Sequence, residues 1–213
     1  MDKSIEINGV AYQLPDIEAD AWTRLLNASL RAKDAFRTAA LATQSRATQP
    51  GTETAQRTVV LRQTDRQTQA VFFHSDRRAD KTGQIEAQPR VSCLFYDDRS
   101  RIQLRLQGTA TVFMNDATAD EHWNKLPVSS RKSYFSLLTP GSVQAEPTDG
   151  LPENLQNRVL PTPAQSEAGR ANFAVIRVQI TFMDWLWLGE NGHRRAQFAY
   201  ENGALARLDW VAP

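Results

Sequence analysis

The sequence predicts a mainly β protein in which short antiparallel strands form a barrel or a sandwich, together with a few helices. Apolar and polar residues alternate over Ile102–Leu106 and Ile176–Phe182, which is the period of a strand with one buried face. Turn formers such as Asn202-Gly203 separate the predicted strands. The regular alternation of strands with helices that a parallel α/β sheet needs is missing.

Composition is that of an ordinary globular chain. The 213 residues are 41% apolar and 23% charged, which excludes chain-wide disorder, collagen and coiled coil. Lys and Arg total 25 against 24 for Asp and Glu, so nothing favours binding to nucleic acid or to a membrane surface. Cys93 is the single cysteine, which excludes an intrachain disulfide and a cysteine-rich zinc site. We expect one domain spanning residues 1–213.

The first residues, MDKSIEINGV, lack the apolar core of a signal peptide. No window approaches about 18 consecutive apolar residues, the length of a membrane-spanning helix. We therefore expect a cytoplasmic protein without a membrane partner.

The N-terminal part should contain a short extended segment over residues 1–15, with a turn at Asn8-Gly9, and then a helix over about 16–33. Asp16 is the expected N-cap, because its carboxylate can accept from the first free N–H groups. Four apolar residues recur at helical spacing and predict a packing face: Trp22, Leu25, Leu26 and Leu30.

The middle of the chain reads as strands with two short helices. β-branched and aromatic residues bounded by turn formers predict strands over 39–43, 57–62, 70–74, 91–96 and 102–112, with a polar turn over 44–54. Helices are expected over 80–88, where Pro89 blocks continuation, and over 116–126, with Trp123 buried.

Residues 140–170 contain five prolines and many polar residues, so they predict a loop that either covers a site or is a solvated insertion. The last segment returns to strands and ends in a hairpin at Asn202-Gly203.

Several catalytic motifs are absent. The chain has no G-x-G-x-x-G after a strand, no Walker loop, no H-E-x-x-H and no serine nucleophile elbow. Its three histidines, His74, His122 and His193, are too far apart in sequence for a recognised metal spacing. We therefore expect no metal site.

Basic and hydroxyl groups gather near two strands and suit a phosphate. Arg57 and Arg62 stand at the two ends of an apolar strand, on opposite faces unless a bulge intervenes. The stretch from Ser75 to Lys81 adds Arg77 and Arg78 at the start of a predicted helix, where free N–H groups favour an anion. The alternative is a solvated, charged turn.

These residues resemble the FMN-binding core of the pyridoxamine 5′-phosphate oxidase-related proteins. The matching pieces are RTVVLR at 57–62, FFHSDRRADK at 72–81, QIEAQPRVSCLF at 84–95 and QLRLQGTA at 103–110. DWLWLG at 184–189 and ARLDWVAP at 206–213 resemble the end of that family. The resemblance implies a six-stranded-type antiparallel split β-barrel that forms a homodimer, with FMN between the two chains.

The resemblance also implies the residues that contact the cofactor and the substrate. Cofactor contacts fall on Arg57, Thr58, Val59, Val60, Leu61, Arg62, His74, Ser75, Arg78, Lys81, Gln103, Trp187 and Gln197. Substrate contacts fall on Arg62, His122, Ser130, His193 and Arg195.

The departures from the family pattern concern the substrate. Asp80 stands where the oxidase has an arginine before the phosphate-binding lysine, so Arg77 or Arg78 would have to replace that guanidinium. Residues 193–197, HRRAQ, replace the oxidase's R-x-H-x-R, and an aromatic hydroxyl and a cation for the substrate phosphate fall at His122 and Leu126. We therefore expect little oxidation of pyridoxamine 5′-phosphate.

Three functional interpretations remain at this point. The favoured one is a flavoprotein oxidoreductase with an unidentified small-molecule substrate, in which no catalytic side chain is assigned and His122 and His193 are candidate bases. The second is a flavin-binding module without turnover, and the third is a split barrel whose ligand has changed to deazaflavin or haem. A genuine pyridoxamine 5′-phosphate oxidase is a further alternative to the favoured interpretation.

Overall fold

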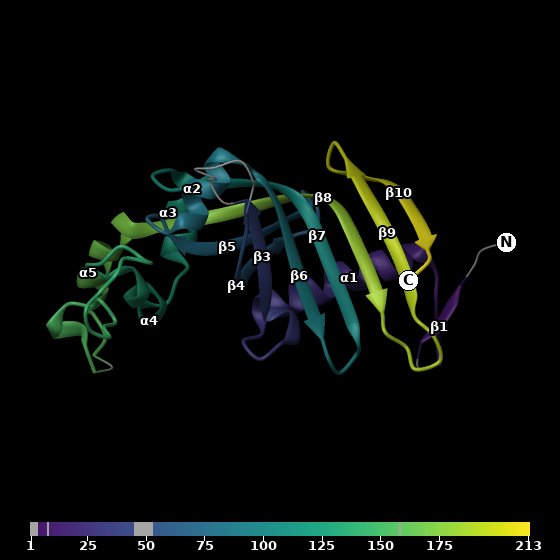
Figure 1. Cartoon of the computed structure of the whole chain (residues 1–213), viewed down its shortest axis with the longest axis horizontal. Helices are drawn as coiled ribbons and strands as arrows, with labels where there is room; N and C mark the ends of the chain where they lie inside the picture. Colours follow the sequence, from purple (N-terminus) through teal and green to yellow (C-terminus); the bar gives the residue numbers. More distant parts are fainter. Residues whose placement is uncertain (1–3, 8, 45–52, 158) are drawn as a thin grey trace.

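Six strands close into an antiparallel barrel in the computed structural model, which describes residues 4–7, 9–44, 53–157 and 159–213 (Figure 1). Around the barrel the strand order is β8-β5-β4-β3-β6-β7, and β7 pairs again with β8 to complete the circle. The strands are β3 (Thr38–Gln44), β4 (Thr54–Asp65), β5 (Ala70–Asp76), β6 (Arg90–Asp97), β7 (Ile102–Phe113) and β8 (Phe173–Trp187). The predicted split-barrel fold is confirmed.

Strand β8 joins the barrel to a hairpin. Its first half pairs with β5 and its last six residues pair with β9 (Arg194–Glu201), while β7 runs along its other edge. β9 continues into β10 (Ala204–Val211) through a turn in which Asn202 and Gly203 both have positive φ, as the Asn-Gly pair predicts. A separate pair of short strands, β1 (Ile5–Ile7) and β2 (Val10–Tyr12), precedes the barrel. Asn8, half of the predicted turn between them, lies outside the described residues.

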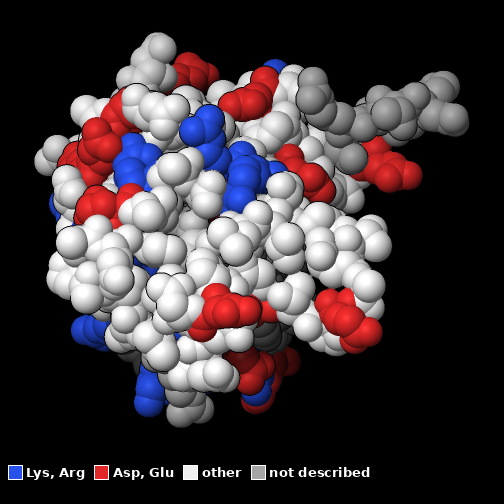
Figure 2. All heavy atoms as spheres, turned by 90° about the vertical axis from the view of Figure 1, so that its left-hand side faces the viewer, with Lys and Arg blue, Asp and Glu red and all other residues white. Residues whose placement is uncertain are grey.

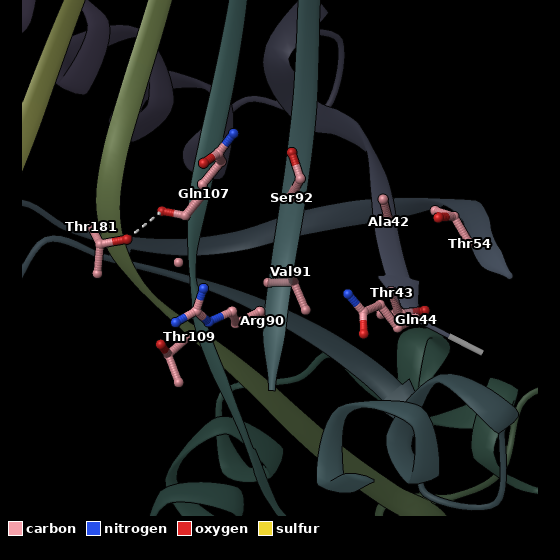
Figure 3. A pocket seen from close by; sticks show the side chains of 11 residues that line it. Ala42, Thr43, Gln44, Thr54, Arg90, Val91, Ser92, Gln107, Thr109 and Thr181 are labelled. Carbon is pink, nitrogen blue, oxygen red and sulfur yellow. Dashed lines mark hydrogen bonds between the residues drawn. The ribbon is translucent and has the colours of Figure 1, made fainter. Parts of the chain in front are cut away.

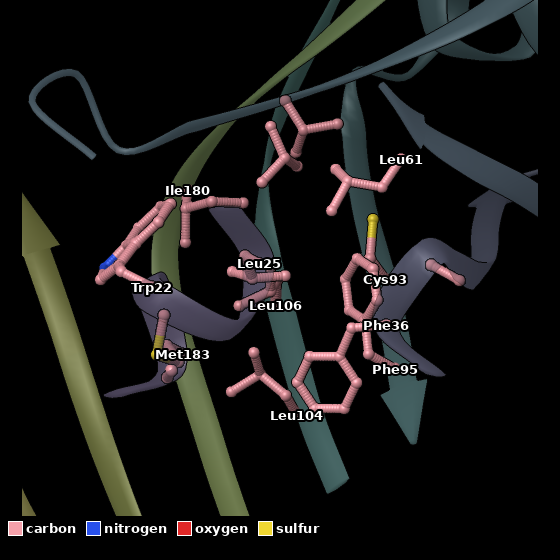
Figure 4. Close-up of a cluster of buried hydrophobic side chains, with 14 of the residues drawn as sticks. Trp22, Leu25, Phe36, Leu61, Cys93, Phe95, Leu104, Leu106, Ile180 and Met183 are labelled. Carbon is pink, nitrogen blue, oxygen red and sulfur yellow. The ribbon is translucent and has the colours of Figure 1, made fainter. Parts of the chain in front are cut away.

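Helix α1 (Leu14–Leu30) packs against the barrel and covers the main core, which Figure 4 shows in part. Gln13, not Asp16, is the N-cap. Asp16 lies in the first turn, where its carboxylate accepts a hydrogen bond of 2.9 Å from the Gln13 backbone N–H. The helix therefore begins two residues earlier than predicted.

The buried face of α1 also differs from the prediction. Leu26 and Leu30 are exposed, although Trp22 and Leu25 are buried as expected. The residues that complete the buried stripe are Ile17, Ala21 and Ala28. Alanine at two of these positions allows the helix to pack closely against the sheet. The spacing of the leucines alone does not predict this close packing.

A lobe of short helices covers the outer face of β5 and the start of β8. It contains α3 (Ala117–Asn124), α4 (Val128–Arg131), η2 (Lys132–Tyr134), η3 (Glu153–Leu155), α5 (Pro163–Ser166) and η4 (Glu167–Asn172). Its own core is built from Ala70, Phe72, Ala119, Trp123, Leu126, Tyr134, Phe173 and Val175. Trp123 is buried, as the sequence predicts.

Buried Arg131 contacts several elements of this lobe. Its guanidinium donates to Ser166 Oγ at 3.0 Å, pairs with Glu167 and lies over the Trp123 ring. The last part of the predicted loop, residues 163–170, is thereby folded and anchored, whereas residues 140–149 are exposed. Two further helices lie at the barrel: η1 (Ala35–Arg37) and α2 (Asp80–Ala87).

None of the helices in the described ranges is long and apolar enough to cross a membrane. Cys93 is fully buried in the main core, and this burial raises the pKa of its thiol to about 12. The thiol is therefore protonated and unreactive at neutral pH.

Candidate functional site

Two basic side chains and a hydroxyl meet where β5 ends and α2 begins. Lys81 Nζ lies 3.2 Å from Ser75 Oγ, and Arg57 reaches the same region from β4. Arg57 donates to Thr43 Oγ1 at 2.5 Å and to Gln84 Oε1 at 2.8 Å, which fixes its guanidinium. We call Arg57, Ser75 and Lys81 the cationic group.

The cationic group lacks a neutralising carboxylate among the described residues. Among the described residues, no carboxylate oxygen lies within 4.0 Å of the basic nitrogen atoms of Lys81 or Arg57. Burial lowers the pKa of Lys81, and the charge of Arg57 lowers it further, while Asp76 and Asp80 act weakly in the opposite direction. Lys81 and Arg57 are half-buried and repel each other, so an anion bound between them would stabilise both charges.

Arg78 is paired with a neighbouring acid. Its Nε and Nη2 hold both carboxylate oxygens of Asp76 at 3.0 and 2.6 Å, and Nη2 also donates to the Ser136 carbonyl at 2.9 Å. Of the two arginines considered as substitutes at Asp80, only Arg77 has a guanidinium without a hydrogen bond to described residues. Figure 2, which views this end of the molecule, shows basic side chains gathered with acidic ones around them.

A pair of histidines lies on the outer face of β5, beneath the lobe. His74 Nε2 and His122 Nδ1 are 3.0 Å apart, and the His122 ring stacks on Phe72 with 5.3 Å between ring centroids. Burial lowers the pKa of His74 to about 3, with the charges of His122, Arg62 and Arg37 acting in the same direction. Burial also lowers the pKa of His122. Both imidazoles are therefore neutral at pH 7, and one donates to the other.

Arg62 lies beside this pair at a bulge in β4. The register between β4 and β5 shifts between Leu61 and Gln63, so Arg62 has no partner residue across the ladder. The side chains of Val59 and Leu61 point into the core, whereas Thr58 is exposed and Val60 is half-buried. Arg62 Nε and His74 Nδ1 are both buried and have no hydrogen-bond partner among the described residues. Two unpartnered polar atoms in one cluster fit a ligand that would hydrogen-bond them.

A second polar patch lies on the outer face of β7, β8 and β9, around Asp184. Arg105 and Gln197 stand opposite Asp184 on the two neighbouring strands, and Gln103 and Arg195 both stand opposite Leu186. Asp184 accepts from Arg105 at 2.5 Å, from Arg195 at 2.9 and 2.7 Å, and from Gln197 at 3.2 Å. We call Gln103, Arg105, Asp184, Arg195 and Gln197 the outer patch.

The remaining predicted residues are Trp187, His193 and Ser130. Trp187 ends β8 but packs against the main core, and a Cβ on Gly189 would lie 2.6 Å from its ring. His193 is exposed in the loop between β8 and β9, and Ser130 lies half-buried in α4.

The cationic group and the outer patch lie at opposite ends of β8. Ser75 pairs with Ala174 near the start of this strand, and Gln103 pairs with Leu186 near its end. The twelve residue steps from Ala174 to Leu186 correspond to about 40 Å along the strand at 3.3 Å per residue. One chain therefore does not bring the predicted cofactor residues together.

Sequence reasoning missed Arg105 and Asp184 as members of the outer patch. Arg105 follows Gln103 on the polar face of a predicted strand, and Asp184 is a lone acid in the apolar run FMDWLW. An acid within such a run indicates a buried carboxylate that needs cationic partners.

A hollow of about 440 Å³ lies elsewhere, against β3, β6, β7 and β8 (Figure 3). Polar and apolar atoms both line it, and its residues include one cation, Arg90, but none of the predicted site residues. The residues are Ala42, Thr43, Gln44, Thr54, Arg90, Val91, Ser92, Gln107, Gly108, Thr109 and Thr181. With a single exposed cation, this hollow suits a phosphate less well than the cationic group does.

Comparisons with known proteins agree with this fold. Residues 19–114 match the family model described as pyridoxamine 5′-phosphate oxidase, FMN-binding domain. A pyridoxamine 5′-phosphate oxidase-related, FMN-binding protein from Nostoc punctiforme shares 22% identity over 91% of this chain and 96% of its own, with a TM-score of 0.68. No curated protein matches the sequence.

Two further solved structures share the fold at lower identity. PhzG from Burkholderia lata, in complex with tetrahydrophenazine-1-carboxylic acid, is 15% identical over 93% of this chain and 92% of its own, with a TM-score of 0.62. A protein related to general stress protein 26 from Clostridium acetobutylicum is 8% identical over 88% and 96%, with a TM-score of 0.53.

Proposed function

We propose that the chain is an FMN-dependent oxidoreductase. Residues 19–114 match the FMN-binding domain of pyridoxamine 5′-phosphate oxidase, which supports FMN as the cofactor. We further propose that it works as a homodimer with FMN between the two chains. The cationic group of one chain and the outer patch of its partner would together form each site. The observation that carries this proposal is the separation of the two groups along β8.

The residues present fit FMN. Lys81, Arg57 and Ser75 offer charge-assisted hydrogen bonds to a terminal phosphate. Arg62, on the same strand as Arg57, has a buried Nε without a hydrogen-bond partner among the described residues and offers a further donor. No dinucleotide-binding loop is present in the sequence, so the site favours FMN over FAD.

When bound, FMN supplies the capacity to accept two electrons from a substrate. The chain's own residues hold and orient it, and they set the charge around it. His122, supported by His74 and Phe72, presents a neutral imidazole to the same region. We propose it as a substrate contact, with Arg62 and Ser130 beside it.

The substrate is proposed to be a small molecule other than pyridoxamine 5′-phosphate. Leu126 is buried and cannot donate, and nearby Arg131 is held by Glu167 and the lobe's carbonyl groups. Arg195 and Gln197 both bind Asp184. A substrate phosphate would therefore lack several cations, and each missing charge-assisted hydrogen bond costs about 1.5–3 kcal/mol.

FMN titration of the purified apoprotein tests the cofactor site. The variant Lys81→Met removes a charge but keeps the length of the side chain. We expect its affinity for FMN to fall about ten- to a hundredfold, the equivalent of one charge-assisted hydrogen bond. Lys33→Ala, an exposed lysine distant in sequence from the cationic group, serves as the control. Equal affinity in Lys81→Met and wild type would remove Lys81 from the phosphate site.

Turnover assays separate the enzymatic proposal from a flavin-binding module without activity. Reduction of the bound flavin by a nicotinamide cofactor, or peroxide release with an amine, would support an oxidoreductase. With pyridoxamine 5′-phosphate and oxygen we expect turnover far below about 10 per second, the median for enzymes. A rate within tenfold of that value would show a genuine oxidase. We also propose a cytoplasmic location, which fractionation of expressing cells tests.

A further inference from the structure

Asp184 points away from the core and yet is only 1% exposed, because neighbouring side chains cover it. Its strand neighbours Met183 and Trp185 are in the main core, which places Asp184 on the outer face of β8. Burial alone would raise the pKa of this carboxyl, but hydrogen bonds from Arg195 and Arg105 hold it below its usual value. The ionised carboxylate and the two guanidinium groups leave the cluster with one net positive charge.

The two arginines use their hydrogen-bond donors unequally. Arg195 commits Nε and Nη2 to Asp184 as a fork. Arg105 commits only Nη2, and its Nε is buried without a partner among the described residues. The Arg105 side chain is also more exposed, at 41% against 27%. Because a guanidinium carries five N–H donors, Arg105 retains donors for a ligand.

We propose that Arg105 supplies the positive charge that the flavin site lacks at Gln197. The family resemblance implies an arginine that contacts the flavin at position 197, and glutamine carries no charge. Gln197 and Arg105 bind the same oxygen of Asp184 from the two flanking strands. The charge is therefore retained within the cluster, but it comes from β7 instead of β9.

This inference rests on the proposed function, because the outer patch contacts flavin only if FMN binds between two chains. Gln103, an implied flavin contact, lies two residues before Arg105 on the same face of β7. Reduction adds negative charge to the flavin, so a nearby cation binds the reduced form more tightly than the oxidised form. The midpoint potential of bound FMN should therefore depend on Arg105.

The test compares Arg105→Gln, Arg195→Gln and Arg207→Gln with wild type. Arg207→Gln is the matched control, since it removes an arginine that pairs with Asp209 on β10 and not with Asp184. The measurements are the dissociation constant of FMN, the midpoint potential of bound FMN, thermal melting and sedimentation. They report binding and potential without requiring a substrate.

We expect Arg105→Gln to weaken FMN binding about tenfold. Reduced FMN should lose at least tenfold more affinity than oxidised FMN, which lowers the two-electron potential by about 30 mV. Arg195→Gln should have a smaller effect on FMN affinity, and Arg207→Gln should have none. Unchanged affinity and potential in a folded Arg105→Gln dimer would overturn the proposal, and so would a larger loss of affinity in Arg195→Gln.

Arg105→Gln should fold, because glutamine keeps an N–H donor and Arg195 and Gln197 still hold Asp184. If it does not fold, Arg105→Met decides the question. Methionine keeps most of the length of the side chain but carries neither charge nor N–H donors. Wild-type FMN affinity and midpoint potential in Arg105→Met would then overturn the proposal. Failure of the wild-type protein to bind FMN would instead overturn the proposed function.

Discussion

His74 and His122 show how a single residue pair changes the chemistry of a site. If His74 carried its proton on Nδ1, this buried N–H would have no hydrogen-bond partner among the described residues. It would also lie close to the cation of Arg62. A lone pair at this position is more compatible with a nearby positive charge. His74 Nε2–H then donates to His122 Nδ1, which leaves the Nε2–H of His122 as a donor for the proposed ligand. The pair therefore offers a neutral donor, where a protonated imidazole would add a charge.

The depressed pKa of His74 predicts how stability depends on pH. The unfolded chain binds a proton on this histidine below about pH 6.5, whereas the folded chain does so only near pH 3. The unfolded state thus binds more protons between these values, and stability falls as the pH is lowered through this window. The contribution of His74 to the slope is at most about 1.4 kcal/mol per pH unit.

The variant His74→Gln, which cannot titrate, should flatten the plot of unfolding free energy against pH between about 3 and 6.5. Urea unfolding at several pH values measures this slope. His193→Gln is the control, because His193 is exposed in a loop and its surroundings change little on unfolding. A slope in His74→Gln equal to that of wild type would contradict the buried, neutral state of His74.

Also at the level of single residues, the sequence predicted which residues form a site better than it predicted which residues contact each other. It identified Arg57, Ser75 and Lys81 as a phosphate-competent set, and these residues do converge. It did not foresee that Asp76 would engage Arg78, or that His74 would meet His122 across 48 positions. Such pairings depend on the path of the chain in space, which local pattern does not encode.

At the scale of elements, alternation predicted the strands of the barrel but underestimated their length. β4 runs from Thr54 to Asp65, beyond the apolar stretch 57–62, because ladder hydrogen bonds continue through polar residues. The predicted hairpin at Asn202-Gly203 formed because its turn chemistry is local. Of the lobe, only α3 with its buried Trp123 was predicted. The other helices are short and depend on Arg131 and the lobe's own core. The polar turn predicted over 44–54 lies largely outside the described residues.

Closure of the barrel depends on Gly108, where the register between β7 and β8 shifts. A Cβ at this position would lie 2.0 Å from the backbone oxygen of Gln179. Gly108→Ala should therefore force the strands apart and destabilise the fold by roughly 1–3 kcal/mol. Gly83→Ala is the matched control, because its Cβ would have open space and alanine favours helix α2 by about 0.5–1 kcal/mol. Urea denaturation compares the two, and equal stability of the two variants would contradict the close approach at Gly108.

At the scale of the whole molecule, the long strand β8 organises the proposed function. The cationic group lies beside its start, where Ser75 pairs with Ala174, and the outer patch lies near its end. A ligand that needs both groups must therefore lie between two copies of the chain. A two-fold axis would then create two equivalent sites per dimer, because each chain offers both groups.

Complementation between two defective subunits tests this arrangement. One subunit carries Lys81→Met, which impairs the cationic group, and the other carries Gln103→Ala with Arg105→Gln, which impairs the outer patch. A mixed dimer unites the intact cationic group of one chain with the intact patch of the other at one of its two sites. Co-expression with two affinity tags isolates this mixed dimer, and each homodimer measured alone is the control.

We expect the mixed dimer to bind FMN to about half the wild-type capacity, since two-fold symmetry pairs each group with the opposite chain. The homodimers should bind weakly at both sites, and sedimentation should show that all three species are dimers. If both groups served one site within a single chain, the mixed dimer would have no intact site and would bind as weakly as the homodimers.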